Sequence, residues 1–357
     1  MEKVIYINYM KQLGHLHFDQ IQIDALVAQG YDVKLLMHQE IALQLPYPKE
    51  MYALVLPSWT DTDSTCSLTK RISYVLALHY IKRKINFSRF DHILISNLDE
   101  VTLGIYPLTK GMYMICHGNS NDFSSRIKTY FLNRLARQHN TFLVFNEEMA
   151  KPFRQNGISK TAIISHGCFS PFKVEKESRA FAFIEEFSHV VFHPSSKTAG
   201  DFVAAVYTES MNQTLKASHT LLLLRDLSVE DRKYSNIHII HGFLSEADYQ
   251  YLFVKAHIIL LAYPAAFSNQ VSGVSYECVA NQKKMLIWHN PSLAYCKTYY
   301  EYDPFVETAG ELVEKMFYLT HTSDNQMKVD ARMLTTNFSR IFTNNGGCIQ
   351  YKENNDV

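Results

Sequence analysis

Short apolar runs alternate with longer amphipathic or polar segments along almost the whole chain. Each run has the length of a buried strand, and glycine or asparagine ends several of the segments between runs. In the first half we expect strands at Val4–Ile7, Tyr31–Leu36, Ala53–Leu56, His92–Ile95, Met112–Cys116, Thr141–Phe145 and Thr161–Ile164. Helical segments are expected through Ile21–Val27 and over Glu147–Gln155.

A second series of the same kind follows Pro171. Its expected strands are His189–His193, Thr220–Leu224, Ile237–Ile240, Ile258–Ala262 and Lys284–Trp288, with helices near 199–215, 245–255 and 273–281. Because strands and helices alternate, each series predicts a parallel sheet covered on both faces. We therefore expect two doubly wound, Rossmann-like α/β domains facing a cleft. They cover residues 1–170 and 171–343, and a polar tail follows at 344–357.

Composition narrows the function classes. The 357 residues suffice for two cores, and the 35 basic and 35 acidic side chains cancel, so overall charge does not favour a nucleic-acid partner. The six cysteines form no C-x-x-C pair, which argues against a zinc site and suits a reducing compartment. The start of the chain lacks a signal-peptide pattern and no apolar stretch is long enough to span a bilayer, so we expect a cytoplasmic protein.

The segment 258–288 contains the most informative candidate site. An apolar run is followed by a polar loop and by a predicted helix that starts at Ser272, Gly273 and Val274. The serine is expected to cap free backbone N–H groups, and the glycine lets a ligand approach the main chain closely. Such a helix start attracts anions, above all a diphosphate. Glu277 lies about one turn inside, where its carboxylate can accept hydrogen bonds from a sugar or ribose hydroxyl.

This segment resembles the nucleotide-sugar site of retaining GT-B glycosyltransferases of the large family 4 type. Their motif pairs two glutamates with seven residues between them; Glu277 matches the second, and Asn269 stands at the first position. The resemblance implies transfer of a sugar from a nucleotide-diphosphate donor to a hydroxyl of a glycan or lipid-linked glycan, with retention, in surface polysaccharide synthesis. It also implies metal-independent catalysis, with no cofactor apart from the donor substrate.

The resemblance extends to further positions in the second half. Lys197 follows a strand where the family places a lysine on the donor diphosphate, and His193 or Arg225 would supply a second positive group. Gly242, Phe243 and Leu244 resemble the family's base-binding loop. We assign catalytic roles to Asn269, Glu277, Lys197 and His117, and donor binding to His193, Arg225, Gly242, Phe243, Leu244, Ser272, Gly273 and Val274.

Three residues of the first half complete the candidates. Gly14 and His15 occupy the first strand-to-helix turn, as expected of an acceptor-binding or interdomain position. His117 ends the strand Met112–Cys116, where its ring can contact the donor sugar or the acceptor, or serve as an ordinary structural histidine. We expect no metal ligands among the candidate residues.

Two other functions and one additional contact remain open. A nucleotide-sugar epimerase on the same fold would need acidic groups around the sugar, and a non-catalytic binder of nucleotides or sugars would explain Asn269 in place of glutamate. Two basic stretches interleaved with apolar residues, 70–89 and 126–137, leave open a peripheral contact with the anionic inner face of a membrane. Most such charged helix faces are simply solvated.

Overall fold

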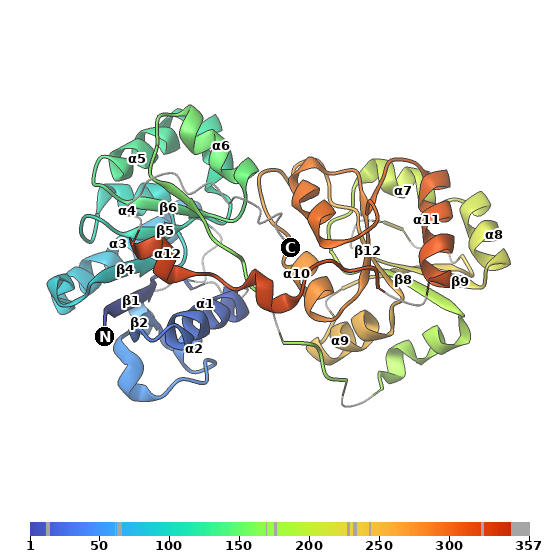
Figure 1. Ribbon diagram of the computed structural model, residues 1–357, viewed down its shortest axis with the longest axis horizontal. Helices are drawn as coiled ribbons and strands as arrows, with labels where there is room; N and C mark the ends of the chain where they lie inside the picture. The colour runs from blue at the N-terminus through green and yellow to red at the C-terminus, as the bar shows by residue number, and fades with distance from the viewer. Residues whose placement is uncertain are drawn as a thin grey trace. The chain divides into compact units, whose positions relative to one another are not determined.

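Two separate parallel sheets organise the chain (Figure 1). In this computed structural model, unit 1 comprises Met1–Gly167 and the segment from Leu334 onward, and unit 2 comprises Cys168–Met333. The structure describes residues 1–11, 15–60, 62, 66–168, 170–174, 177–226, 229–230, 234–242, 244–322 and 325–343. Among these residues no helix combines the length and the apolar character needed to cross a membrane.

The sheet of unit 1 has seven strands in the order β3-β2-β1-β4-β5-β6-β7, all of them parallel. The strands are β1 (Lys3–Asn8), β2 (Asp32–His38), β3 (Tyr52–Leu56), β4 (His92–Ile95), β5 (Tyr113–Ile115), β6 (Thr141–Val144) and β7 (Thr161–Ile163). The helices are α1 (Leu16–Ala28), α2 (Gln39–Ala42), α3 (Ser67–Lys84), α4 (Glu100–Ile105), α5 (Arg126–Ala136) and α6 (Glu147–Gln155). α1 and α2 lie on one side of this sheet and α3 to α6 on the other (Figure 1), as right-handed crossovers require.

The sheet of unit 2 has six parallel strands in the order β10-β9-β8-β11-β12-β13. They are β8 (His189–His193), β9 (Thr220–Arg225), β10 (Ile237–Ile240), β11 (Ile258–Leu261), β12 (Lys284–Trp288) and β13 (Phe305–Val306). α7 (Gly200–Val206), α8 (Glu209–Ala217) and α11 (Ala309–His321) pack on one face through a shared apolar core. α9 (Glu246–Lys255) and α10 (Gly273–Ala280) lie on the other face (Figure 1).

The prediction of two doubly wound domains is confirmed, and every expected strand is present to within two residues at each end. The helix expected near 199–215 is in fact two helices, α7 and α8. The break has a local cause, because the hydroxyl of Thr208 accepts a hydrogen bond from the Met211 N–H and so caps a new helix. The short edge strand β13 and the small helices α2 and α4 were not predicted.

The C-terminal end of the described chain belongs to unit 1, unlike in the predicted division at 171–343. Helix α12 (Phe338–Thr343) packs over the amino ends of β4 and β5, where the ring of Phe342 stacks on His92 with centroids 3.9 Å apart. The Gln29 side chain accepts hydrogen bonds from the backbone N–H groups of Phe338 and Ser339, at the free start of this helix. The two bonds of Gln29 join residues more than 300 positions apart, so no local pattern reveals them.

Gly167 occupies a position that only glycine fits. Its φ is +85°, and a Cβ there would come within 2.3 Å of Cγ2 of Ile21. We predict that Gly167→Ala lowers the free energy of unfolding by about 2–4 kcal/mol, from left-handed strain and overpacking together. Urea denaturation followed by circular dichroism measures the loss. Gly118→Ala, where a Cβ has open space and φ is −143°, is the control in the same unit; equal stabilities of the two variants would contradict the assignment.

Candidate functional site

The strand order of unit 2 reverses between β8 and β11, which are neighbours in the middle of the sheet. After β8 the chain adds β9 and β10 on one side, and after β11 it adds β12 and β13 on the other. Open parallel sheets bind ligands at the carboxyl ends of their strands beside such a reversal. β8 ends at His193, and the loop after it carries Lys197. β11 ends at Leu261, and the segment after it leads through Asn269 to α10. The structure therefore brings these predicted residues to one edge of one sheet.

Lys197 is exposed, and its ammonium group makes no hydrogen bond or ion pair with the residues that the structure describes. Its loop is shaped by the hydroxyl of Ser195, which accepts from the Lys197 N–H and donates to the Lys197 carbonyl, both at 3.2 Å. At the end of β9, Arg225 donates to the Pro194 carbonyl at 3.3 Å and so braces the same loop. A cation held on such a loop can reach an anionic ligand at this edge.

The expectation that Ser272 caps α10 is wrong. Its hydroxyl bonds instead with the Tyr263 hydroxyl at 2.7 Å, and its backbone N–H donates to the Tyr295 hydroxyl at 2.9 Å. Because the serine makes no capping bond, the N–H groups of Gly273 and Val274 in the first turn have no hydrogen-bond partner among the described residues and can donate to a ligand. A Cβ on Gly273 would meet no described atom within 4 Å, so there is room directly beside this glycine.

Glu277 is the carboxylate nearest this helix start along α10. It is partly buried, and its Oε2 accepts a 2.5 Å hydrogen bond from the hydroxyl of Tyr249 on α9. Burial raises the pKa of Glu277 to about 7, and the bond from Tyr249 acts in the opposite direction. The carboxyl group is therefore about half ionised near neutral pH, and its charged form accepts hydrogen bonds from hydroxyl groups.

Of the two alternatives for a second positive group, His193 and Arg225, His193 does not suit the role. Its ring is fully buried, and Nδ1 donates to the Leu260 carbonyl at 2.8 Å. Burial lowers the pKa of His193 to about 4, so the ring is neutral at physiological pH. Nε2 is buried and makes no hydrogen bond of good geometry with the part of the chain that the structure describes. His193 thus ties β8 to β11 at the strand-order reversal, and positive charge at this edge comes from Lys197 and Arg225.

The remaining donor-binding candidates lie after β10. Gly242 has φ +92°, which glycine adopts without strain, and Leu244 is partly buried just before Ser245, whose hydroxyl caps α9 by accepting from the Asp248 N–H. Phe243 and Gly14 lie outside the residues that the structure describes.

In unit 1, the rings of His117 and His15 are in contact, although the sequence placed them only at two separate strand ends. Their rings are 4.3 Å apart edge to face, and Phe18 packs against His117 at 4.7 Å. His117 Nε2 contacts the Ser96 carbonyl at 3.1 Å, so it carries the proton and leaves Nδ1 as an acceptor. Burial and the nearby His15 and His166 hold the pKa of His117 well below its usual range. His117 is therefore a neutral hydrogen-bonding group.

Several tyrosines at this edge of unit 2 were not predicted as site residues from the sequence. Tyr249, Tyr263 and Tyr295 come from α9, from the loop after β11 and from the 3-10 helix Pro291–Tyr299, and only the fold gathers them around α10. Tyr263 directly follows a predicted strand, which was the one usable signal. Among the described residues, no group of His, Cys, Asp or Glu side chains is arranged to hold a metal ion.

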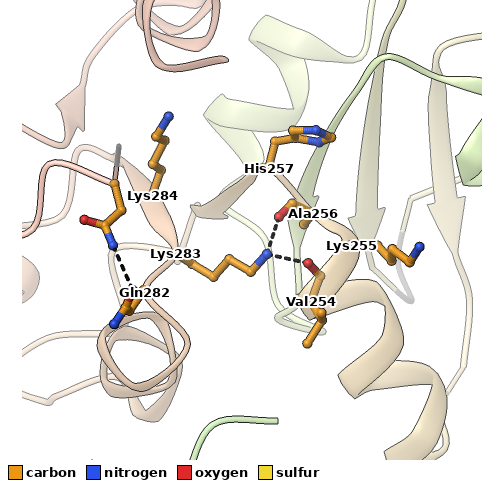
Figure 2. A pocket seen from close by; sticks show the side chains of 8 residues that line it. Val254, Lys255, Ala256, His257, Gln282, Lys283 and Lys284 are labelled. Carbon is orange, nitrogen blue, oxygen red and sulfur yellow. Dashed lines mark hydrogen bonds between the residues drawn. The ribbon is translucent and has the colours of Figure 1, made fainter. Parts of the chain in front are cut away.

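A hollow of about 310 Å³ lies at the opposite, amino edge of the same sheet, next to the starts of β11 and β12. Figure 2 shows Lys283 reaching across it to the carbonyls of Val254 and Ala256, at the end of α9. Lys284 bonds in the same way to the carbonyls of Leu319 and Thr322 at the end of α11. These lysines satisfy helix C-termini, and no predicted site residue lines this hollow.

No protein-family model and no curated protein matches the sequence. Solved structures do resemble it. WaaG, a glycosyltransferase of lipopolysaccharide biosynthesis, is 13% identical with a TM-score of 0.53, covering 91% of this chain and 92% of its own. HepE of Anabaena, in complex with UDP-glucose, is 12% identical with a TM-score of 0.55, covering 97% and 96%.

The UDP-GlcNAc 2-epimerase of Neisseria meningitidis, bound to UDP-GlcNAc, is 11% identical with a TM-score of 0.55, covering 97% of this chain and 99% of its own. The fold of this chain is GT-B. At such low identities the likeness shows the fold alone, and the GT-B fold serves both a transferase and an epimerase among these neighbours.

Asn269 has φ +47°, a left-handed conformation that asparagine adopts far more readily than other non-glycine residues. This backbone gives a structural reason for asparagine where the resembling family has glutamate. We predict that Asn269→Ala lowers the free energy of unfolding by about 1 kcal/mol, whereas Asn269→Gly, which keeps the backbone but removes the side chain, does not. Thermal unfolding of the two variants measures the loss of stability in each. Equal losses would mean that side-chain contacts, not backbone strain, select this residue.

Proposed function

We propose that the protein is a glycosyltransferase that moves a sugar from a nucleotide-diphosphate donor to a hydroxyl of a glycan or lipid-linked glycan, with retention at the anomeric carbon. The observation that carries the proposal is Glu277, a partly buried carboxylate one turn inside a helix whose first residues have no side-chain cap and have room beside Gly273. A diphosphate at that start and a ribose hydroxyl at Glu277 would use both features at once.

In this proposal, unit 2 would supply the groups that the reaction needs at the donor. The exposed ammonium of Lys197 and the N–H groups of Gly273 and Val274 would offset the negative charge that grows on the departing diphosphate. Leu244 and Gly242 would border the base, as the resemblance to the family implies. Asn269 keeps an acceptor oxygen but carries no charge, so it would orient the donor sugar by hydrogen bonds rather than by electrostatic attraction.

Unit 1 is assigned the acceptor. His117, with His15 beside it, lies at the carboxyl edge of its sheet and is neutral, which suits a group that accepts a hydrogen bond from a sugar hydroxyl. Retention and the placing of the reaction in surface polysaccharide synthesis rest on the resemblance described above. The epimerase among the fold neighbours keeps a nucleotide-sugar epimerase as the second candidate, and a non-catalytic binder as the third.

Incubation with UDP-glucose, ADP-glucose and GDP-mannose, with and without acceptor glycans, separates the three candidates. Transfer or slow release of the sugar supports the transferase. Interconversion of sugars without release supports the epimerase, and binding without turnover supports the non-catalytic reading.

We predict that Glu277→Ala and Glu277→Gln weaken nucleotide binding by about 10–100-fold, because a hydrogen bond to a charged group contributes about 1.5–3 kcal/mol. Titration calorimetry with the nucleoside diphosphates measures the dissociation constants. Glu246→Gln, an exposed glutamate on α9, is the matched control and should leave them unchanged. Wild-type dissociation constants in both Glu277 variants would remove this residue from the site.

We also propose peripheral contact with an anionic membrane through α3 and α5, which neighbour α4 on the same face of unit 1. α3 is apolar on two sides: Ala77, Leu78 and Ile81 are buried. On the outer side, Leu68, Ile72 and Leu76 follow one another at four-residue spacing and are 68%, 54% and 45% exposed. Such a stripe is unusual for a helix that only packs on a sheet.

Positive charge surrounds this stripe. Lys82, Arg83 and Lys84 end α3, and neither α3 nor α5 contains an acidic residue. On α5, Ile127 and Tyr130 are exposed beside Arg126 and Arg134. Apolar side chains ringed by lysine and arginine are the composition of a surface that rests in the headgroup region of an anionic bilayer.

We predict weak binding to anionic vesicles that moderate salt reverses, since charges are screened within about 10 Å at 0.1 M. Replacing Ile72 and Leu76 together with serine should lower partitioning at least about tenfold. Co-sedimentation with anionic and neutral vesicles is the measurement. Phe317→Ser, which removes an exposed apolar side chain of α11 in unit 2, is the control. Equal binding to both vesicle types would contradict a contact driven by membrane charge, and no binding to either would show that these helix faces are only solvated.

A further inference from the structure

We propose that Tyr249 is a positioning residue: its hydroxyl holds one carboxylate oxygen of Glu277 so that the other faces the ribose of a bound nucleotide. The inference rests on the proposed function, in which Glu277 receives the ribose, and adds to it a residue for which the sequence held no motif.

The topology of unit 2 places the two side chains together. α9 follows β10 and α10 follows β11, so both helices start at the carboxyl edge and lie on the same face of the sheet. Tyr249 and Glu277 each lie just past the first turn of their helix. The hydroxyl of Tyr249 donates to Oε2 at 2.5 Å, and no hydrogen bond of Oε1 occurs with the described residues.

The ring of Tyr249 is held before any ligand binds. It contacts Phe172, Phe192 and Phe253, with centroids 6.0, 6.4 and 5.8 Å away. The terminal torsion of a glutamate side chain is broad and has no single preferred value. A hydrogen bond from a fixed ring therefore sets the plane of a carboxylate that would otherwise rotate, and a preset acceptor loses less entropy on binding.

The same bond controls the charge of Glu277. Burial raises the pKa of Glu277 to about 7, and the Tyr249 hydroxyl opposes that rise. The other titratable neighbours, Tyr263 and Cys278, are neutral near pH 7, because burial raises the pKa of each, as it does for Tyr249. Among these groups, Glu277 is the one with a pKa near 7. Burial lowers the pKa of Lys283 to about 8, but its ammonium group bonds to the carbonyls of Val254 and Ala256, at the opposite, amino edge of the sheet. The ionised form of Glu277 accepts from ribose hydroxyls, so nucleotide affinity should rise with pH through about 7, and loss of the tyrosine hydroxyl should move that rise upward.

The test is the affinity for the tightest binder among UDP-glucose, ADP-glucose and GDP-mannose, whose diphosphate esters do not titrate near neutral pH. Between about pH 6 and about pH 8, wild-type affinity should rise about tenfold. Tyr249→Phe keeps the ring and its packing; its affinity should fall at least about threefold at pH 7 and recover at higher pH. Tyr251→Phe, which removes another α9 hydroxyl bonded to Glu185 at 3.1 Å, should match the wild type.

Two outcomes overturn the inference while leaving the function standing: an unshifted pH profile in Tyr249→Phe, or a loss of affinity equal at every pH, which packing alone would produce. NMR titration of Glu277 in the unliganded protein gives a readout that needs no nucleotide, and there Tyr249→Phe should raise the carboxyl pKa. A wild-type chain that binds none of the three nucleotide sugars would instead overturn the proposed function, and the role of Tyr249 with it.

Discussion

In each unit, the position of the candidate loops depends on the point where the strand order of the parallel sheet reverses. In unit 1 the chain builds β1, β2 and β3 in one direction and then returns to place β4 against β1; in unit 2 it does the same from β8 to β11. At such a point the loops leave the sheet in opposite directions, so their backbone groups cannot cover one another. The loops carrying Lys197 and Asn269, and in unit 1 the turn at His15, all leave from these reversals.

The chemistry at this edge of unit 2 comes from polar groups that the fold leaves partly satisfied. The start of α10 has no side-chain cap, because Ser272 is committed to Tyr263 and Tyr295. Glu277 has one oxygen held by Tyr249 and one without a partner among the described residues. His193, by contrast, is buried and neutral and serves the sheet. Burial therefore separates residues that form the framework from those that can meet a ligand, and residue type alone does not.

The backbone at Asn269 favours asparagine over the glutamate that the resembling family has at this position. A positive φ suits asparagine and glycine and is unfavourable for glutamate. The loop can thus keep a hydrogen-bonding side chain in a conformation that the longer carboxylate would strain. The cost is the negative charge that the resembling family places beside the donor sugar.

The sequence by itself determined the alternation of strands and helices, and with it the two parallel sheets, because burial on both faces of a sheet leaves a continuous apolar run at each strand. It also identified the loop and helix start around Ser272 and Glu277, since a small polar residue followed by glycine has a local meaning at a strand-to-helix turn. The cap predicted at Ser272 is absent, and His193, one of two alternatives for a second positive group, is neutral. Neither Tyr249 nor the return of α12 to unit 1 was predicted.

Those features were decided by tertiary structure alone. Tyr249 and Glu277 are 28 positions apart, His193 and Leu260 are 67, and Gln29 and Phe338 are 309. A hydrogen bond or a pKa depends on which groups surround a side chain in space, and periodicity along the chain reports only which face of its own helix or strand it occupies.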